Sequence, residues 1–200
     1  MVKIVLTIII SYLIGSISPS ILIGRARGID IKKEGSGNAG TTNALRVLGA
    51  KAAVITLVVD ILKGLLPAIL FPLIFGMPEL CYWSSLAAFI GHLFPVYYGF
   101  KGGKGVAVAF GGLLGVNWKL ALLCPLTVVI VTLITKRMSA GSISGAALAV
   151  VYAIFLEKGF LPFIIIMAAL IIFMHRGNIK RLINGEEPPL GFLAGKGKTK

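Results

Sequence analysis

This sequence is poor in charged residues, above all in acidic ones. Only 14% of its 200 residues are charged, and Asp and Glu together number 7, whereas a soluble domain carries about 25% charged residues. The chain has only two cysteines, Cys81 and Cys124, both in or beside apolar segments. Neither a disulfide framework nor a cysteine metal site is indicated. The scarcity of charge excludes an ordinary soluble core.

Short segments of alternating apolar and polar residues are also lacking. What is present is continuous hydrophobic sequence, with 57% apolar residues and a mean hydropathy of +0.96. Only helices and closed barrels span a bilayer, and the lack of alternation argues against a barrel. The first apolar run leads into basic sequence and not into a cleavage site, so a signal peptide is not indicated. We expect an all-α membrane protein.

Seven apolar runs are long enough, or nearly so, to cross a bilayer. They predict transmembrane helices near residues 2–23, 52–75, 80–98, 105–116, 120–135, 143–156 and 160–175, in a single integral-membrane domain over residues 1–200. The fourth run rises only about 16 Å as an α-helix, so it either crosses or re-enters. The runs are rich in glycine, which allows close helix contact.

The distribution of basic residues decides between crossing and re-entry. If all seven runs cross, 16 of the 20 basic residues lie on one side, namely Arg25, Arg27, Lys32, Lys33, Arg46, Lys51, Lys101, Lys104, Lys136, Arg137, Arg176, Lys180, Arg181, Lys196, Lys198 and Lys200. If the fourth run re-enters, Lys136 and Arg137 move to the basic-poor side. The positive-inside rule therefore predicts seven spans, with the N-terminus outside and the C-terminus in the cytoplasm.

The first cytoplasmic segment reads GSGNAGTTNALR, from Gly35 to Arg46. Its glycines allow backbone N–H groups to turn inward as an anion-binding nest. Thr41 or Thr42 would cap a short helix whose N-terminus favours negative charge. Asn43 and Arg46, three residues apart, share a face of that helix. The alternative is a flexible linker.

The second segment includes GHLFP and GGKG, which precede the fourth span. Backbone amides at a helix N-terminus, together with Lys104, form a phosphate cradle. It is not a Walker loop, because the spacing and the magnesium-binding hydroxyl are missing. The alternative is a tight turn, and His92 is either a site residue or a packing residue.

The third segment, HRGNIKRLINGEE, follows the seventh span. Its helical spacing lets His175 and Asn178 face one way among basic residues, although an amphipathic interfacial helix is an alternative.

Two smaller features lie outside these three segments. Asp60 and Lys63, three apart within a span, predict an ion pair, and Ser142 in a cytoplasmic turn would cap the sixth span or bind an oxyanion.

This inventory indicates binding of a polyanion, most readily phosphate. No acidic cluster to hold a metal is present, no Ser-His-Asp set is apparent, and no HxxxxD pair occurs, since Tyr97 and Lys180 stand at the acidic positions. Many anion binders with little nucleophile equipment suit transfer between two phosphate-bearing substrates. The rivals are a transporter of organic phosphates, whose sites lie nearer the midplane with internal repeats, and a non-catalytic scaffold.

Taken together, the three segments with DILKG and GSISG resemble the bacterial integral-membrane glycerol-3-phosphate acyltransferases that use acyl-phosphate, in order and spacing over the whole chain. The resemblance implies transfer of a fatty acyl group from acyl-phosphate to the 1-hydroxyl of glycerol 3-phosphate, giving lysophosphatidic acid and phosphate. That reaction is the first acylation of phospholipid synthesis. The resemblance implies that no cofactor, metal or nucleic-acid partner is needed. It also implies a functional link to the enzyme that makes acyl-phosphate.

The resemblance also implies residue roles at a cytoplasm-facing site in the bacterial inner membrane. The residues expected to take part in catalysis are Ser36, Lys104, His175 and Asn178. The residues expected to bind substrate are Ser36, Asn38, Thr41, Asn43, Arg46, His92, Gly102, Gly103, Lys104, Gly105, Ser142, His175 and Asn178. Either His175 or the donor phosphate would accept the proton of the attacking hydroxyl, and the poverty of carboxylates favours the donor phosphate.

Overall fold

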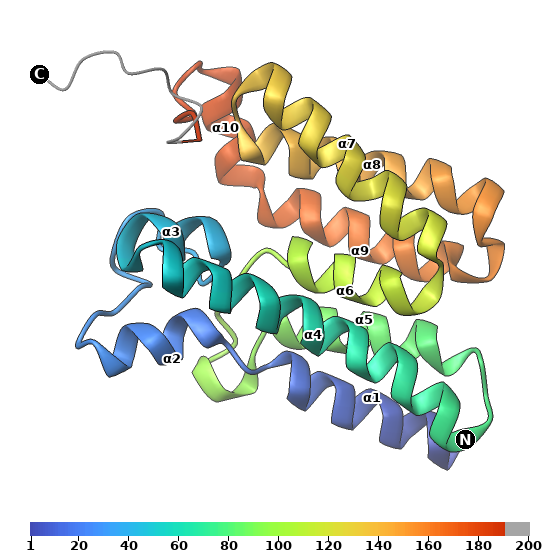
Figure 1. Cartoon of the computed structure of the whole chain (residues 1–200). Coiled ribbons are helices and arrows are strands. Elements are labelled where there is room, and N and C mark those ends of the chain that lie inside the picture. Colours follow the sequence, from blue (N-terminus) through green and yellow to red (C-terminus); the bar gives the residue numbers. More distant parts are fainter. Residues whose placement is uncertain (191–200) are drawn as a thin grey trace, which may run out of the picture. The chain divides into compact units, whose positions relative to one another are not determined.

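The computed structural model describes residues 1–190, and every regular element in that range is helical (Figure 1). The described residues group into two compact units, Met1–Trp118 and a second unit that begins at Lys119. The predicted all-α class is confirmed, whereas a single domain over 1–200 remains a prediction. The basic residues Lys196, Lys198 and Lys200 lie outside the described residues.

The first unit is a group of packed helices. They are α1 (Val2–Gly15), α2 (Pro19–Ala26), α3 (Thr41–Leu48), α4 (Ala50–Phe75), α5 (Leu80–Leu93) and α6 (Val106–Val116), with a 3₁₀ turn at Val96–Tyr98. Helix α4 packs along α5 and α6, and α1 packs along α5. Figure 1 shows α2 and α3 at the same end of this group. That end carries the first two of the three predicted segments.

Glycines allow the helices of the first unit to approach closely. A Cβ atom at Gly64 on α4 would overlap the carbonyl oxygen of Val108 on α6, and one at Gly111 on α6 would overlap that of Ile61 on α4. Small residues at such crossings let backbones meet directly, which is how helices associate in lipid. The expectation of close contact between glycine-rich spans is confirmed for this pair.

The first predicted span, 2–23, is broken into two helices. Helix α1 ends at Gly15, and Pro19 opens α2 at its first position, with Ser18 extended before it (φ −116°, ψ 100°). Proline has no N–H and disfavours a helical residue before it, so Pro19 ends one helix and begins the next. The break exposes backbone carbonyls within an apolar region, and the carbonyl oxygen of Ile17 accepts a hydrogen bond from Lys63 Nζ at 2.7 Å.

The second unit contains α7 (from Trp118 to Thr135), α8 (Met138–Leu156), a 3₁₀ turn at Lys158–Phe160, α9 (Leu161–Met174) and α10 (Arg176–Ile183). Helices α8 and α9 pack together, and the axis bends by 57° between the α9 segment and α10. Helix α8 begins five residues before the predicted start at 143. Ser142 therefore lies inside α8, and its prediction as a helix cap in a turn was wrong.

Four helical stretches are long and apolar enough to cross a membrane: Val2–Ala26, Ala50–Phe75, Trp118–Thr135 and Met138–Leu156. A fifth is available if the bent pair Lys158–Met174 and Arg176–Ile183 forms one span. Large apolar side chains such as Leu73, Ile134 and Phe155 are about three-quarters exposed, as expected for a surface that faces lipid. Seven spans and the direction of the termini remain predictions, because α5 and α6 are short.

Candidate functional site

The first predicted segment is a loop held in place by one buried amide. Asn43 is 1% exposed, and its Nδ2 donates hydrogen bonds to the carbonyl oxygens of Ile31 (3.2 Å) and Glu34 (3.0 Å). Its Oδ1 accepts a hydrogen bond from the backbone N–H of Ser36 at 2.9 Å. Both donors of the Asn43 amide are thus used within the loop. Asn43 therefore shapes the loop, and its part in substrate binding stays a prediction.

The other predicted residues of this segment are placed around that anchor. Helix α3 forms as predicted, but its N-cap is Gly40 and no side chain caps it, so the prediction of a threonine cap was wrong. Thr41 is the first residue of α3, and its buried Oγ1 has no hydrogen-bond partner within the described residues. Such a hydroxyl costs about 1–3 kcal/mol if nothing satisfies it. Ser36 and Arg46 are exposed, and Asn38 is half-buried.

The second predicted segment forms a tight loop against the end of α5. The N–H of Gly102 donates to the carbonyl oxygen of Leu93 at 3.0 Å, and that of Gly103 donates to the carbonyl oxygen of His92 at 3.1 Å. These two amides are therefore not directed at an anion, contrary to the prediction. Glycine at these two positions lets the loop backbone approach His92 closely, since a Cβ at either position would overlap backbone or ring atoms of His92.

The features of this loop that suit an anion lie at the N-terminus of α6. Gly105 is the N-cap of α6 with φ +84°, and a Cβ there would overlap the ring of Phe89, so glycine is required by conformation and by space. The first helical hydrogen bond runs from Ala109 N to Gly105 O. The amides of the first turn, 106–108, have no acceptor within the helix and carry its positive dipole end. Half-buried Lys104 lies directly before them.

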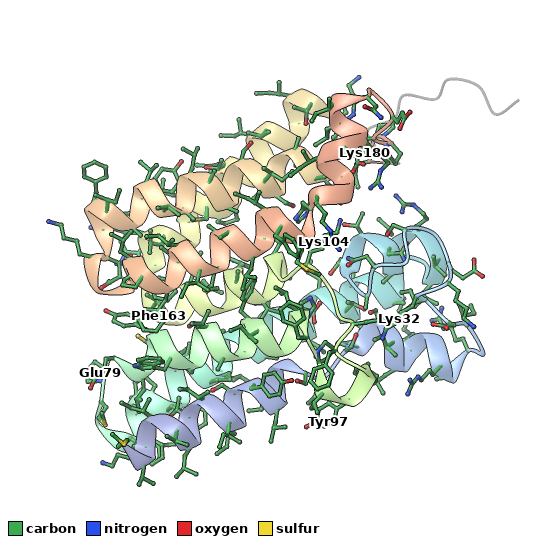
Figure 2. All side chains as sticks on the ribbon, turned by 180° about the vertical axis from the view of Figure 1, so that it is seen from behind. Lys32, Glu79, Tyr97, Lys104, Phe163 and Lys180 are labelled. Carbon is green, nitrogen blue, oxygen red and sulfur yellow. The ribbon has the colours of Figure 1, made fainter. Side chains whose placement is uncertain are left out.

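The first two segments meet within the first unit. A Cβ at Gly103 would come within 3.1 Å of the carbonyl oxygen of Ala39, and Lys32 Nζ donates to the carbonyl oxygen of Tyr98 at 3.0 Å. Partial burial lowers the pKa of Lys32, Asp30 opposes this, and the nearby charges of Arg25 and Lys101 lower it further. Figure 2 shows Lys32 and Lys104 toward one end of this unit and Glu79 at the other. Lys32 and Lys104 therefore lie toward the same end of the unit.

Behind the glycine loop lies a buried ionic cluster. The predicted ion pair is confirmed: Lys63 Nζ is 2.8 Å from Asp60 Oδ1, and both side chains are nearly inaccessible. The third member of the cluster is His92, whose Nδ1 also lies 2.8 Å from Lys63 Nζ. The sequence did not predict this contact. The signal available was the presence of three ionisable residues inside predicted spans, which favours mutual pairing.

The third predicted segment lies in the second unit. His175, 3% exposed, stands at the junction of α9 and α10, and its Nδ1 lies 2.8 Å from the carbonyl oxygen of Ile171. Asn178 Nδ2 donates to Glu187 Oε1 at 2.6 Å. The same carboxylate accepts from Ser139 Oγ (2.7 Å) and Arg181 Nε (2.7 Å). Sequence reasoning gave Glu187 no role, although it orders the segment that carries Asn178.

Glu187 is charged despite its burial. Desolvation opposes ionisation, but hydrogen bonds from Ser139, Asn178 and Arg181, with the charge of Arg181, outweigh it and hold the pKa of this carboxyl below its ordinary value. Ser142, also buried, donates from Oγ to the carbonyl oxygen of Met138 at 2.9 Å, so donating to an oxyanion requires rotation of its hydroxyl. Within residues 1–190 no group of three or more His, Cys, Asp or Glu side chains is arranged to hold a metal.

The arrangement defines a class of protein: a helical membrane protein with a glycine loop, a lysine and a helix N-terminus that suit a phosphate group. The sequence profile described as glycerol-3-phosphate acyltransferase matches residues 5–185. Relatives with that name are 44% identical over 184 residues in Thioalkalivibrio sulfidiphilus (90% of this chain, 91% of the relative) and 43% identical over 183 residues in Shewanella sediminis (90% of each). The chain therefore belongs to the glycerol-3-phosphate acyltransferase family.

Solved structures agree over nearly the whole chain. A crystal structure of PlsY, an integral membrane glycerol 3-phosphate acyltransferase, in its glycerol 3-phosphate form has a TM-score of 0.89 and 37% identity, covering 95% of this chain and 96% of that one. The lysophosphatidic acid form of PlsY has a TM-score of 0.85 and 36% identity, covering 93% and 94%. The resemblance seen in the sequence is confirmed, and with it an integral-membrane acyltransferase of phospholipid synthesis.

Proposed function

We propose that this chain transfers a fatty acyl group from acyl-phosphate to the 1-hydroxyl of glycerol 3-phosphate, giving lysophosphatidic acid and inorganic phosphate. The observation that carries the substrate and the product is the whole-length likeness to PlsY in its glycerol 3-phosphate and lysophosphatidic acid forms. The donor rests on the resemblance of the three segments and on the poverty of acids and bases in the chain. An acyl-phosphate has a good leaving group, so a strong general acid is unnecessary.

In the first unit, Lys104, the first turn of α6 and Arg46 would bind the phosphate of glycerol 3-phosphate. In the second unit, His175 and Asn178 would bind substrate, as the resemblance of the third segment implies. Lys104 supplies a point charge next to the orphan amides, which is the combination that binds phosphate at helix N-termini. Asn178 is oriented by its hydrogen bond to Glu187. In the first unit, Ser36, Asn38 and Thr41 would bind the head of acyl-phosphate, and the unpartnered hydroxyl of Thr41 supports that role. In the second unit, Ser142 would bind the donor, as the resemblance implies.

In the transfer, the 1-hydroxyl oxygen attacks the acyl carbon and the bond from that carbon to the phosphate oxygen breaks. The electron pair leaves with inorganic phosphate, and the hydroxyl proton goes to the donor phosphate or to His175. The carbonyl of Ile171 can only accept a hydrogen bond, so Nδ1 of His175 carries a proton. A neutral His175 ring then has its lone pair on Nε2, where a base needs it. The scarcity of other bases keeps the donor phosphate as the preferred acceptor.

We further propose that the chain crosses a bacterial inner membrane seven times, with its N-terminus outside and its site facing the cytoplasm. The positive-inside distribution supports this direction. Acyl-phosphate then arrives through the lipid and glycerol 3-phosphate from the cytosol. The enzyme that makes acyl-phosphate is the expected functional neighbour.

The donor is tested by purifying the full chain in detergent and supplying glycerol 3-phosphate with acyl-phosphate, acyl-CoA or acyl carrier protein in turn. We expect lysophosphatidic acid, identified by mass spectrometry, only with acyl-phosphate. Product from the thioesters alone would contradict the proposed donor while leaving the family activity intact. No product from any donor would contradict the function as a whole.

A further inference from the structure

We propose that Lys63 fixes His92 as a neutral ring with its proton on Nε2, and that this Nε2–H donates to a phosphate oxygen held at the loop of residues 102–105. His92 would then be a substrate-binding donor, and Lys63 and Asp60 would be positioning residues. The identity of that phosphate as a substrate's rests on the proposed function. The protonation state of the ring does not, because it follows from the contacts of the cluster.

The first step concerns the three protons of the Lys63 ammonium. An ammonium has three N–H donors and no acceptor. Nζ is hydrogen-bonded to the carbonyl oxygen of Ile17 at 2.7 Å and to His92 Nδ1 at 2.8 Å, and it forms an ion pair with Asp60 Oδ1 at 2.8 Å. Because an ammonium cannot accept a hydrogen bond, Nδ1 of His92 must be the acceptor.

The second step concerns charge. Asp60 and Lys63 neutralise each other in a site that is almost fully buried. A proton on Nδ1 would face the ammonium at 2.8 Å, and the nearest Asp60 oxygen is 3.6 Å from Nδ1, too far for a hydrogen bond. An uncharged Lys63 beside a neutral ring would leave the Asp60 carboxylate unbalanced in a low-dielectric interior, which is costly. Moving the Lys63 proton to His92 would keep the balance, but an amine is a stronger base than an imidazole and keeps the proton. The favoured state is a neutral His92 with its one proton on Nε2.

The third step concerns where Nε2 lies. A Cβ at Gly103 would overlap Nε2 and come 3.1 Å from the carbonyl oxygen of Ala39, so Nε2 faces the place where the first two segments meet. His92 is 5% exposed, and among the described residues its only side-chain hydrogen bond is the one to Lys63. The Nε2–H lies beside Gly103, the residue that precedes Lys104, where an anionic oxygen would accept its hydrogen bond.

His175 provides an internal contrast. Its Nδ1 faces the carbonyl of Ile171 and so carries the proton, whereas Nδ1 of His92 faces an ammonium and does not. The chain has only these two histidines. Their neutral rings are therefore expected in opposite tautomers, one a donor at Nε2 and the other an acceptor there.

The tautomers are tested by ¹⁵N-histidine NMR on the full chain in detergent, with His175→Gln and His92→Gln used to assign the two sets of signals. We expect His92 protonated at Nε2 alone at neutral pH, with His175 protonated at Nδ1. Adding glycerol 3-phosphate should shift the Nε2–H signal of His92, and inorganic phosphate should do so more weakly. A His92 ring protonated at Nδ1, alone or with Nε2, would overturn the proposal whatever the enzyme's activity.

Kinetics test the contact with substrate. Gln can place its amide N–H near the position of Nε2, whereas Asn reaches only as far as Nδ1, so His92→Gln and His92→Asn form a matched pair. We expect His92→Asn to lower kcat/KM for glycerol 3-phosphate about 10- to 100-fold, the range for a hydrogen bond to a charged group, with partial rescue in His92→Gln. Equal kinetics in wild type and both variants would overturn the role of Nε2 as a donor.

The positioning residues are tested together, so that no buried charge is left alone. In Asp60→Leu/Lys63→Met the pair is removed at once, and we expect folded protein in which His92 populates both tautomers and KM for glycerol 3-phosphate rises. A double variant whose His92 remains solely protonated at Nε2 would contradict the role of Lys63. If the wild type makes no lysophosphatidic acid, the proposed function fails while the NMR result still decides the tautomer.

Discussion

The two units satisfy a buried charge in opposite ways. In the first unit a cation is surrounded by acceptors, since Lys63 donates to a ring nitrogen and to a carbonyl released by a helix break and forms an ion pair with a carboxylate. In the second unit an anion is surrounded by donors, since Glu187 accepts from Ser139, Asn178 and Arg181. The first cluster lies between apolar helices, and the second lies between the start of α8 and the polar helix α10. The comparison indicates that removing one member of a charged pair destabilises the fold most where water cannot replace that member.

The largest effect is expected from Lys63→Met, which leaves Asp60 buried without its cation. Removing one partner of a buried pair costs about 3–5 kcal/mol, so the protein should lose most of its thermal stability in detergent. Circular dichroism melting and size-exclusion chromatography measure this. Asp60→Leu/Lys63→Met should recover most of the loss, and a double variant as unstable as the single one would contradict the pairing.

A smaller loss of stability is expected from Glu187→Ala. The change leaves Ser139, Asn178 and Arg181 without their acceptor, but Arg181 is 41% exposed and water can satisfy it. We expect a loss of about 1–3 kcal/mol together with lower activity, because Asn178 is no longer oriented. The neighbouring exposed residue provides the control, Glu186→Ala, which should behave as wild type. Equal melting temperatures for both variants would show that Glu187 does not stabilise the fold.

Lys104→Ala should change catalysis and hardly change stability, since Lys104 is a half-buried loop residue. Loss of the point charge beside the α6 N-terminus should raise KM for glycerol 3-phosphate by about 10-fold or more, the range for a charge-assisted hydrogen bond. Initial rates against glycerol 3-phosphate concentration measure it, with the exposed Lys101→Ala as the matched control. Kinetics unchanged from wild type would exclude Lys104 from the site.

The smallest effect concerns pH. The folded-state pKa of Glu187 is depressed, so its ionised form stabilises the second unit above the unfolded-state value, near 4.5. That stabilisation is lost as the pH falls through the lower, folded-state pKa. Melting temperatures from pH 7 down to 3 should therefore fall more steeply for wild type than for Glu187→Gln. Parallel curves would show that Glu187 contributes no linkage.

The sequence predicted what depends on local spacing and missed what depends on tertiary contact. Asp60 and Lys63 are three apart on one helix, so their pairing was accessible, whereas His92 joins them from another helix. The Gly- and Ser-rich start of α8 resembled a turn, but a Cβ at Gly141 would overlap Val128 O on α7. Packing against α7 thus overrides weak helix propensity there.

The candidate site shows the same division. The prediction that the glycine loop binds phosphate followed from its composition. The amides of Gly102 and Gly103 nevertheless donate hydrogen bonds to the end of α5, which only the folded chain reveals. Glu187 reaches Asn178 because the chain reverses after α10 at Gly185, where φ is +74°. No periodicity in the sequence marks that reversal.

The most direct test of the proposed reaction is its stoichiometry. With purified wild-type protein, acyl-phosphate and glycerol 3-phosphate, the amounts of inorganic phosphate and lysophosphatidic acid are measured together over time. We predict equal amounts of the two products and no phosphate release when glycerol 3-phosphate is omitted. Phosphate released without lysophosphatidic acid, or lysophosphatidic acid formed without phosphate, would contradict acyl transfer from acyl-phosphate.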